Sequence, residues 1–212
     1  DYDEAQLWHK KGRTAQAKKA EQDTIDAWKK SGSPKNTRGA KLAAEFAIDD
    51  AEAYYNNVWT PFQITRTITT HNIKAAKAQI QAQNAQIEKL RKTAEDKYIA
   101  LDQFGVVEAT MCAEVRFGDI QYDRGQKIEN IPIPTIIASN DQVSATFQTQ
   151  RDQALQKDLD QAKTAWSDVA DKAKAGGVSN KWSQHALENL AREFPDQYHV
   201  LRQELVQETD KP

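Results

Sequence analysis

The chain lacks most of the features that assign a protein to a class by composition alone. It holds one cysteine, Cys112, among 212 residues, which excludes an internal disulfide framework and leaves the redox compartment open. No apolar run approaches the roughly 18 residues that a membrane span needs, and neither the charged nor the apolar region of a signal peptide is present. The chain begins at Asp1 without a methionine, so we expect a shortened or mature form from which any targeting segment was removed.

A dominant charge is missing as well. Lysine plus arginine number 29 and aspartate plus glutamate number 31, which gives a formal net charge of -2. Because the two signs are interspersed, we do not expect the basic face or stripe of a nucleic-acid-binding protein. The mean hydropathy of -0.81 is low for a globular protein and suits an elongated helical protein with much exposed surface.

Motifs for chemistry are absent too. The sequence contains no GxSxG, P-loop, GxGxxG or HExxH pattern, and its four histidines fall in different segments without a second ligand at helical spacing. Asp49–Asp50 is interpreted as part of an acidic outer face rather than as a catalytic carboxylate pair. Cys112 is interpreted as a buried structural thiol rather than a nucleophile. The sequence therefore predicts a protein that is not an enzyme and holds no metal or cofactor.

The chain does contain one long segment with little charge, 105–134. Its apolar side chains cover nearly the whole circumference of a helix, and a helix that is apolar on most sides must be buried by neighbours on most sides. We therefore expect this helix at the centre of the fold, with Met111, Cys112 and Phe117 largely buried. On that expectation, the substitution Phe117→Ala costs roughly 3–5 kcal/mol of stability.

Periodic apolar residues predict helices along the rest of the chain, and no segment alternates with period two for long enough to make a sheet. The expected helices cover 4–30 with Gly12 as a turn or weak point, 38–57, 62–104, 106–128, a helix from a capping box at Ser139 and Gln142 to Ala175, a short helix to Phe194 capped by Ser179, and 198–205. The predicted fold is all-α, with antiparallel helical hairpins in one domain, 1–212. A division into 1–58 and 59–212 stays open.

The longest predicted helix is 62–104. Thr60–Pro61 resembles a helix start, with a hydroxyl at the N-cap and proline at the first helical position. Ile73, Ile80 and Ile87 then recur at seven residues, which predicts a narrow seam against a partner helix. That seam is either an internal hairpin or the contact of a self-associating dimer.

Two further pairs of residues leave alternatives open. Tyr55 and Trp59 share one helix face. They either form a partly exposed aromatic patch that binds a partner or seal the core at the turn before the long helix. Pro132 and Pro134 either present a Pro-x-Pro ligand to an aromatic groove or turn the chain between two helices.

Three segments resemble a known group of repeat proteins. They are AAEFAIDDAEAYYNNV (43–58), KLRKTAEDKYIALDQFGVVEATMCAEVRFGDIQYDRGQKIENIPIP (89–134) and NKWSQHALENLAREFPDQY (180–198). The motif residues within them are Met111, Cys112, Arg116, Phe117, Gly118, Tyr122, Pro132, Pro134 and Trp182. The chain resembles the tetratricopeptide-repeat (TPR) proteins linked to adventurous gliding motility in myxobacteria and their relatives.

This resemblance implies a TPR-like α-solenoid that serves as a non-catalytic protein–protein interaction scaffold of a bacterial cell-envelope complex. It also implies the C-terminal part of a longer repeat array, periplasmic or associated with the outer membrane, whose partners are other envelope proteins. We expect no nucleic acid, no small-molecule substrate and no transmembrane segment in this chain. The alternative is a structural coiled-coil-like spacer or self-associating dimer built on helix 62–104.

Overall fold

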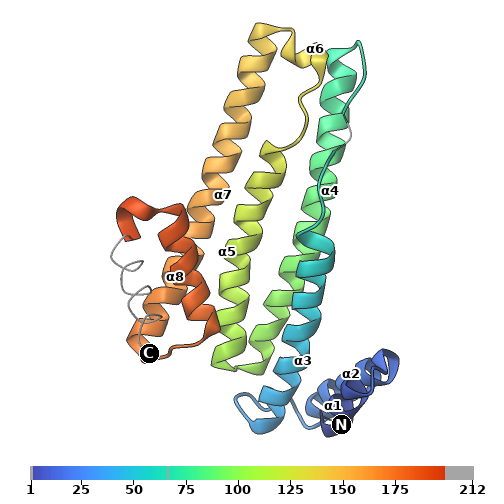
Figure 1. Ribbon diagram of the computed structural model, residues 1–212, viewed down its shortest axis with the longest axis vertical. Helices are drawn as coiled ribbons and strands as arrows, with labels where there is room; N and C mark the ends of the chain where they lie inside the picture. Colours follow the sequence, from blue (N-terminus) through green and yellow to red (C-terminus); the bar gives the residue numbers. More distant parts are fainter. Residues whose placement is uncertain (1, 66, 199–212) are drawn as a thin grey trace.

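The computed structural model describes residues 2–65 and 67–198, and helices make up most of it (Figure 1). The helices are α1 (Tyr2–Lys10), α2 (Thr14–Lys30), α3 (Arg38–Tyr54), α4 (Ile73–Ile99), α5 (Val107–Glu129), α6 (Thr135–Ala138), α7 (Asp141–Gly176) and α8 (Lys181–Glu193). A π-helical turn, η1 (Tyr55–Trp59), continues α3, and a 3₁₀ turn, η2 (Ala100–Phe104), continues α4. No strand occurs in the described residues, so the all-α prediction is confirmed. The predicted helix 198–205 lies almost entirely outside them.

Helix α5 lies at the centre of the fold, as its apolar composition predicts. It packs against α3, α4, α7 and α8, and Figure 1 shows it between α4 and α7, with successive long helices running in opposite directions. Helices α1 and α2 form a hairpin at one end of the molecule. The largest hydrophobic core draws on residues from Trp28 to Leu190 and includes Met111 and Cys112, which are both buried as expected.

The predicted helix 62–104 is wrong in its first part. Through η1 the preceding helix continues to Trp59, and the Thr60 amide donates a hydrogen bond to the Tyr55 carbonyl at 2.8 Å. The described chain is then irregular up to Asn72, whose side chain caps α4. Thr60–Pro61 therefore ends a helix rather than starting one. The segment ITRTITT that follows it is rich in β-branched residues, which disfavour helix.

The unusually long helix is α7 rather than α4. It has 36 residues, against 27 in α4. It begins one position later than predicted, because the side chain of Asn140 rather than Ser139 accepts the hydrogen bond at its start. In the same way Asn180 rather than Ser179 caps α8, and Ser183 completes a capping box by accepting from the Asn180 amide at 3.0 Å. Asparagine caps a helix as well as serine does, so sequence alone could not choose between adjacent candidates.

Two glycines let α5 and α7 approach closely. A Cβ atom at Gly118 would lie 2.6 Å from Nε1 of Trp166, and one at Gly125 would lie 2.9 Å from Cδ1 of Leu155. Both distances are far below van der Waals contact between heavy atoms. The missing side chains therefore allow α7 to bring the Trp166 indole nitrogen within 3.0 Å of the Asp119 carboxylate on α5.

Candidate partner-binding groove and the polar network behind it

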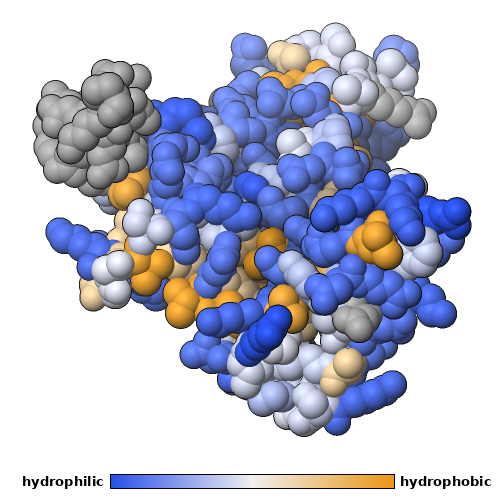
Figure 2. Space-filling model, turned by 60° about the horizontal axis from the view of Figure 1, so that its bottom comes forward, coloured by the Kyte–Doolittle hydropathy of each residue, from blue (hydrophilic) through white to orange (hydrophobic). Residues whose placement is uncertain are grey.

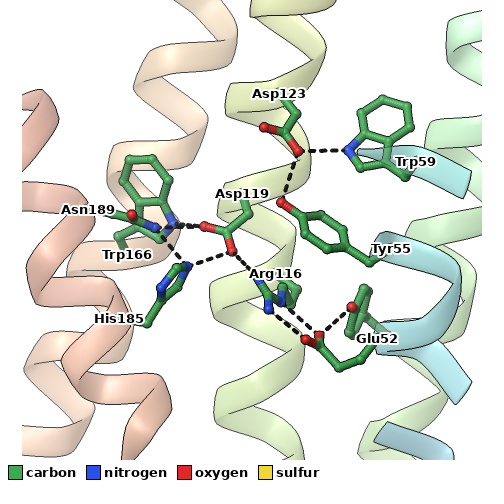
Figure 3. A network of polar contacts seen from close by, with 10 residues as sticks. Glu52, Tyr55, Trp59, Arg116, Asp119, Asp123, Trp166, His185 and Asn189 are labelled. Atoms are coloured by element: carbon green, nitrogen blue, oxygen red, sulfur yellow. Dashed lines mark hydrogen bonds and ion pairs between the residues drawn. The ribbon is translucent and has the colours of Figure 1, made fainter. Parts of the chain in front are cut away.

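Helix α5 carries a row of charged side chains into the interior of the protein, between α3 on one side and α7 and α8 on the other (Figure 3). Arg116, Asp119 and Asp123 are spaced by three and four residues, which places them on one face of the helix. Asp119 is only 5% exposed, and Glu52 of α3 reaches the same row. Because buried charges are costly unless they are paired and hydrogen-bonded, the partners of each group decide what this row can do.

Asp119 accepts hydrogen bonds from four side chains. The donors are Arg116 Nη1 at 2.7 Å, Trp166 Nε1 at 3.0 Å, His185 Nε2 at 2.9 Å and Asn189 Nδ2 at 2.7 Å. Since an ionised carboxylate only accepts, His185 carries a proton on Nε2 in this arrangement. The four donors belong to α5, α7 and α8, so one carboxylate joins three helices.

Arg116 and Glu52 join α5 to α3 in a similar way. The guanidinium donates from Nε and Nη2 to the two oxygens of Glu52 at 2.8 and 2.6 Å, which is the strong bidentate geometry. The Tyr98 hydroxyl donates to the same carboxylate at 2.6 Å. Burial lowers the pKa of Arg116, but the hydrogen bonds to Glu52 and the charge of Asp119 outweigh it, so the net pKa is raised above its ordinary value. The cation is therefore a fixed charge.

Asp123 holds the two aromatic residues that follow α3. Its Oδ2 atom accepts hydrogen bonds from the Tyr55 hydroxyl at 2.9 Å and from Trp59 Nε1 at 3.1 Å. Burial raises the pKa of Asp123 above its ordinary value in spite of these two donors. Tyr55 and Trp59 are 8% and 0% exposed. Of the two alternatives that the sequence left open for Tyr55 and Trp59, the exposed aromatic patch is therefore wrong and the core position is right: both rings fill the core, and their polar atoms donate to a buried carboxylate.

A second polar cluster ties α4, α5 and α7 together further along α5. Arg124 donates to both oxygens of Asp158 at 2.6 and 2.5 Å and also to Glu88. Gln121 donates to Glu95 at 2.6 Å. Among the described residues, no three His, Cys, Asp or Glu side chains are placed to hold a metal ion. The two clusters fix the positions of the helices relative to one another.

Most of the motif residues that carry the TPR resemblance lie in the core or against it. Cys112 is fully buried, and burial raises the pKa of its thiol, which fits a structural cysteine. The Tyr122 ring lies 5.9 Å from the Trp166 ring, and the Arg116 guanidinium lies 5.4 Å from the centre of the buried Trp182 ring. These side chains serve packing around α5.

Pro132 and Pro134 lie in the connection between α5 and α6. Pro134 is buried and Pro132 is half-buried. The Pro134 carbonyl accepts hydrogen bonds from the amides of Ile137 and Ala138 at 2.9 and 3.0 Å. The Pro-x-Pro segment thus turns the chain between two helices, which is the second of the two alternatives that the sequence left open.

Phe117 departs from its prediction. It is 38% exposed, so a largely buried side chain was the wrong expectation, although more than half of its surface is covered. Position 117 lies about 200° around the helix from position 119 and thus on the side away from the polar network. Together with Ala113 it lies in a groove of about 810 Å³ between α4 and α7. Figure 2, in which the lower end of Figure 1 is turned towards the reader, shows hydrophobic residues gathered among hydrophilic ones on this face of the molecule.

The groove combines apolar surface with an acidic rim. Ile99 on α4 is 61% exposed and adjoins it. Among the described residues that line the groove, Lys157 is the one cation, whereas the carboxylates are Glu95, Asp102, Glu114, Asp160 and Asp168. The Oε2 atom of Glu114 is buried without a hydrogen-bond partner in the described structure, while its Oε1 accepts from Lys172. Glu95 is paired with Arg91 and Glu114 with Lys172, so within the described residues the lining carboxylates without an ion pair are Asp102, Asp160 and Asp168. The groove therefore offers apolar contact and these three negative charges.

No protein-family model matches the chain, and no curated protein or solved structure matches it either. None of the described helices is both long enough and apolar enough to cross a membrane. What distinguishes the molecule is a buried hydrogen-bond network around Asp119 and an unfilled groove beside Phe117.

Proposed function

We propose that the protein is a non-catalytic interaction scaffold whose groove between α4, α5 and α7 binds a basic amphipathic helix of a partner protein. The observation that carries the proposal is the combination of two exposed apolar side chains, Ile99 and Phe117, with a rim of carboxylates. An exposed apolar patch that is bordered by polar residues is typical of an interaction site. Helix-in-groove recognition uses this kind of surface.

The dimensions of the groove suit one helix. Its α7 wall extends from Gln153 to Asp168, and 16 residues of helix span about 24 Å. A partner helix of about four turns has this length. Because the two walls and the floor are themselves helices, the apolar side chains of the partner can pack into the spaces between their side-chain ridges.

The charge of the rim selects the partner. A lysine or arginine beside the apolar stripe of the bound helix can cover the groove with its methylene groups while its charged end reaches Asp102, Asp160 or Asp168. The unpaired Oε2 of Glu114 offers a buried acceptor for one such cation. These contacts favour a basic helix over an acidic one of equal hydrophobicity, and they weaken with salt.

The resemblance to gliding-motility proteins suggests where such a scaffold acts. On this proposal the chain is part of a TPR-like α-solenoid in a bacterial cell-envelope complex, periplasmic or outer-membrane-associated, with other envelope proteins as partners. A TPR unit is about 34 residues long and contains two helices, whereas α5 and α7 alone have 23 and 36 residues. The solenoid and the envelope location therefore rest on the motif resemblance, not on helix lengths.

The alternative, a self-associating spacer built on helix 62–104, has less support. Ile80 and Ile87 are 6% and 0% exposed, so the seam that a second copy would need is already covered within the chain. The part of that helix before Asn72 is not helical in the described structure. Both observations favour the internal contact over a dimer seam.

A designed peptide tests the proposal directly. The probe is a fluorescent amphipathic helix of about 15 residues, the length of the groove, with a leucine stripe flanked by lysines. A second peptide keeps the stripe and replaces the lysines by glutamates. Fluorescence anisotropy with the full chain should show binding of the basic peptide, at least about tenfold weaker binding of the acidic one, and loss of affinity with added salt.

Variants of the groove supply the control. The double substitution Ile99→Ser with Phe117→Ser should weaken binding of the basic peptide by about tenfold or more. The matched control is Leu7→Ser in α1, which removes another exposed apolar side chain, 46% exposed, and should leave binding unchanged. Equal binding of the two peptides, or equal effects of the two variants, would refute the groove as the docking site.

A further inference from the structure

A second cavity lies where α5 ends. Helix α5 stops at Glu129, whereas α4 and α7 continue beyond it towards their own N-terminal ends (Figure 1). The chain crosses between them as the connection 130–134 and the short α6. A cavity of about 410 Å³ remains in this region, which is within the usual size range of small-molecule sites. It involves the start of α4 and is separate from the groove near the end of α4.

The composition of α4 leaves this space open. In residues 74–86, KAAKAQIQAQNAQ, Ile80 is the only large apolar side chain, and alanines take most of the other apolar positions. Ile80, Ile137, Val143 and Phe147 line the cavity and form a small hydrophobic cluster apart from the main core. The alanine side chains of α4 are too small to reach α7. The space between the two helices therefore stays unfilled, although its walls are apolar.

The charged groups at the cavity are all cationic. Of the described residues that line it, Lys77, Arg124 and Arg151 are charged, and none is a carboxylate. Arg124 is already paired with Asp158 and Glu88. It therefore belongs to the helix-joining cluster and has little capacity left for a ligand.

Arg151 is different, because its charge is incompletely matched. Its Nε atom is buried and has no hydrogen-bond acceptor in the described structure, and the Oδ1 atom of Asn84 is buried without a donor. The guanidinium lies 5.6 Å from the centre of the Phe147 ring. Burial lowers the pKa of Arg151, although the charges of Glu129 and Asp152 act in the opposite direction. A buried polar atom without a hydrogen-bond partner lowers the stability of the fold, and a bound ligand that supplies the partner removes this cost.

We propose that this cavity binds a carboxylate that carries a medium-length hydrocarbon chain. The carboxylate accepts hydrogen bonds from Arg151, whose planar guanidinium matches it. The carboxamide of Asn84, turned about its last side-chain bond, presents its NH₂ group to the same anion. The hydrocarbon chain lies among Ile80, Ile137 and Val143. The proposal concerns binding alone and does not depend on the partner helix proposed for the groove.

Calorimetric titration of the full chain with decanoate tests this proposal, with decanol as a neutral molecule of the same chain length. Decanoate should bind at one site, and decanol should bind about tenfold or more weakly, because it cannot pair with Arg151. No heat of binding with decanoate, or equal affinity for the two molecules, would overturn the proposal. Binding to phosphatidylglycerol vesicles with none to free decanoate would overturn it as well, in favour of a membrane surface.

Two substitutions locate the site. Arg151→Met should weaken decanoate binding by about tenfold while leaving the affinity for decanol unchanged. The matched control is Arg192→Met, which removes an exposed arginine of α8 that pairs with its neighbour Glu193 and should leave both affinities unchanged. Ala154→Trp places an indole in the cavity that Ala154 lines and should abolish binding of both molecules. Unchanged decanoate binding in Arg151→Met, or equal losses in the two arginine variants, would refute the site.

Discussion

Asp119 and Phe117 lie two residues apart on α5, but their side chains lie in opposite environments. The charged side chain is buried and accepts four hydrogen bonds, whereas the aromatic one lies partly open to solvent in the groove. A surface helix normally turns its apolar stripe inwards and its polar face outwards. In this part of α5 the order is reversed. The comparison teaches that the Asp119 side of α5 joins the neighbouring helices through buried polar contacts, and that the side of Phe117 leaves apolar surface free to bind.

The largest test of this comparison is Asp119→Ala. It removes the carboxylate and leaves the donors Arg116, Trp166, His185 and Asn189 without their acceptor. We expect a loss of about 3–5 kcal/mol in the free energy of unfolding, as found when one partner of a buried charged pair is removed. Urea denaturation measures it. The control, Asp96→Ala, alters an exposed aspartate of α4 and should change stability by about 0.5 kcal/mol or less. Similar losses in the two variants would contradict the network's structural role.

Gly118→Ala tests the close approach of α5 and α7. The added methyl group would lie 2.6 Å from Nε1 of Trp166, so either the indole or the helix must shift. We expect a loss of about 1–3 kcal/mol, the usual cost of overpacking. Gly176→Ala is the control, because a Cβ atom there meets its nearest neighbour at an ordinary 3.5 Å. If Gly118→Ala is as stable as the wild type by thermal unfolding, the helices are not held at this spacing.

Phe117→Ala tests the opposite side of α5. The sequence analysis expected a core position and a loss of roughly 3–5 kcal/mol. Because the side chain is 38% exposed, we now expect about 1–2 kcal/mol by urea denaturation. A loss as large as that of Asp119→Ala would show that the groove is closed in solution and that the two sides of α5 do not differ.

The smallest predicted effect is a pH dependence at Asp123. Burial raises its pKa in the folded protein above the ordinary 3.8. Its contribution to stability is therefore full below the unfolded pKa and declines as pH rises through the folded pKa. Asp123→Asn keeps an acceptor for Tyr55 and Trp59 but does not titrate. The unfolding free energy of the wild type minus that of the variant should fall as the pH rises above about 4. A difference that rises over this range would mean that the two hydrogen bonds dominate instead.

The sequence predicted the helical class and the central place of α5, because uninterrupted apolar periodicity over 106–128 can be buried in few other ways. It also placed the turn at Gly12, which has a positive φ of 68° and separates α1 from α2. Both correct predictions depend on patterns within a short stretch of chain, and a single sequence contains all the residues of such a pattern.

The failures depend on contacts between distant segments. The apolar circumference of α5 predicted burial on all sides, but Phe117 is 38% exposed in the groove between α4 and α7. The partners of Asp123 are more than 60 positions away, since Tyr55 and Trp59 precede it by 68 and 64 residues. Spacing within one helix could not show that their polar atoms meet a carboxylate.

The groove beside Phe117 and the cavity beyond the end of α5 could not be predicted from the sequence either. The spacing of Ile73, Ile80 and Ile87 predicted a narrow seam along α4, but not that the alanine, glutamine and asparagine around Ile80 leave one wall of a cavity. Its meaning depends on the length of α5, which ends while α4 and α7 continue. The expectation of no small-molecule substrate was made without knowledge of that cavity.

The most direct test of the central claim is to map where the basic amphipathic peptide binds. Amide chemical shifts of the ¹⁵N-labelled full chain, recorded as the peptide is added, report the contacted residues. The account predicts that the changes concentrate at Glu95–Asp102, Ala113–Phe117 and Gln153–Asp168, which line the groove. Residues around His185 and Asn189, on the network side of α5, should remain unmoved. Changes centred on the network side, or spread evenly over the surface, would contradict the claim that the Phe117 side of α5 is the binding surface.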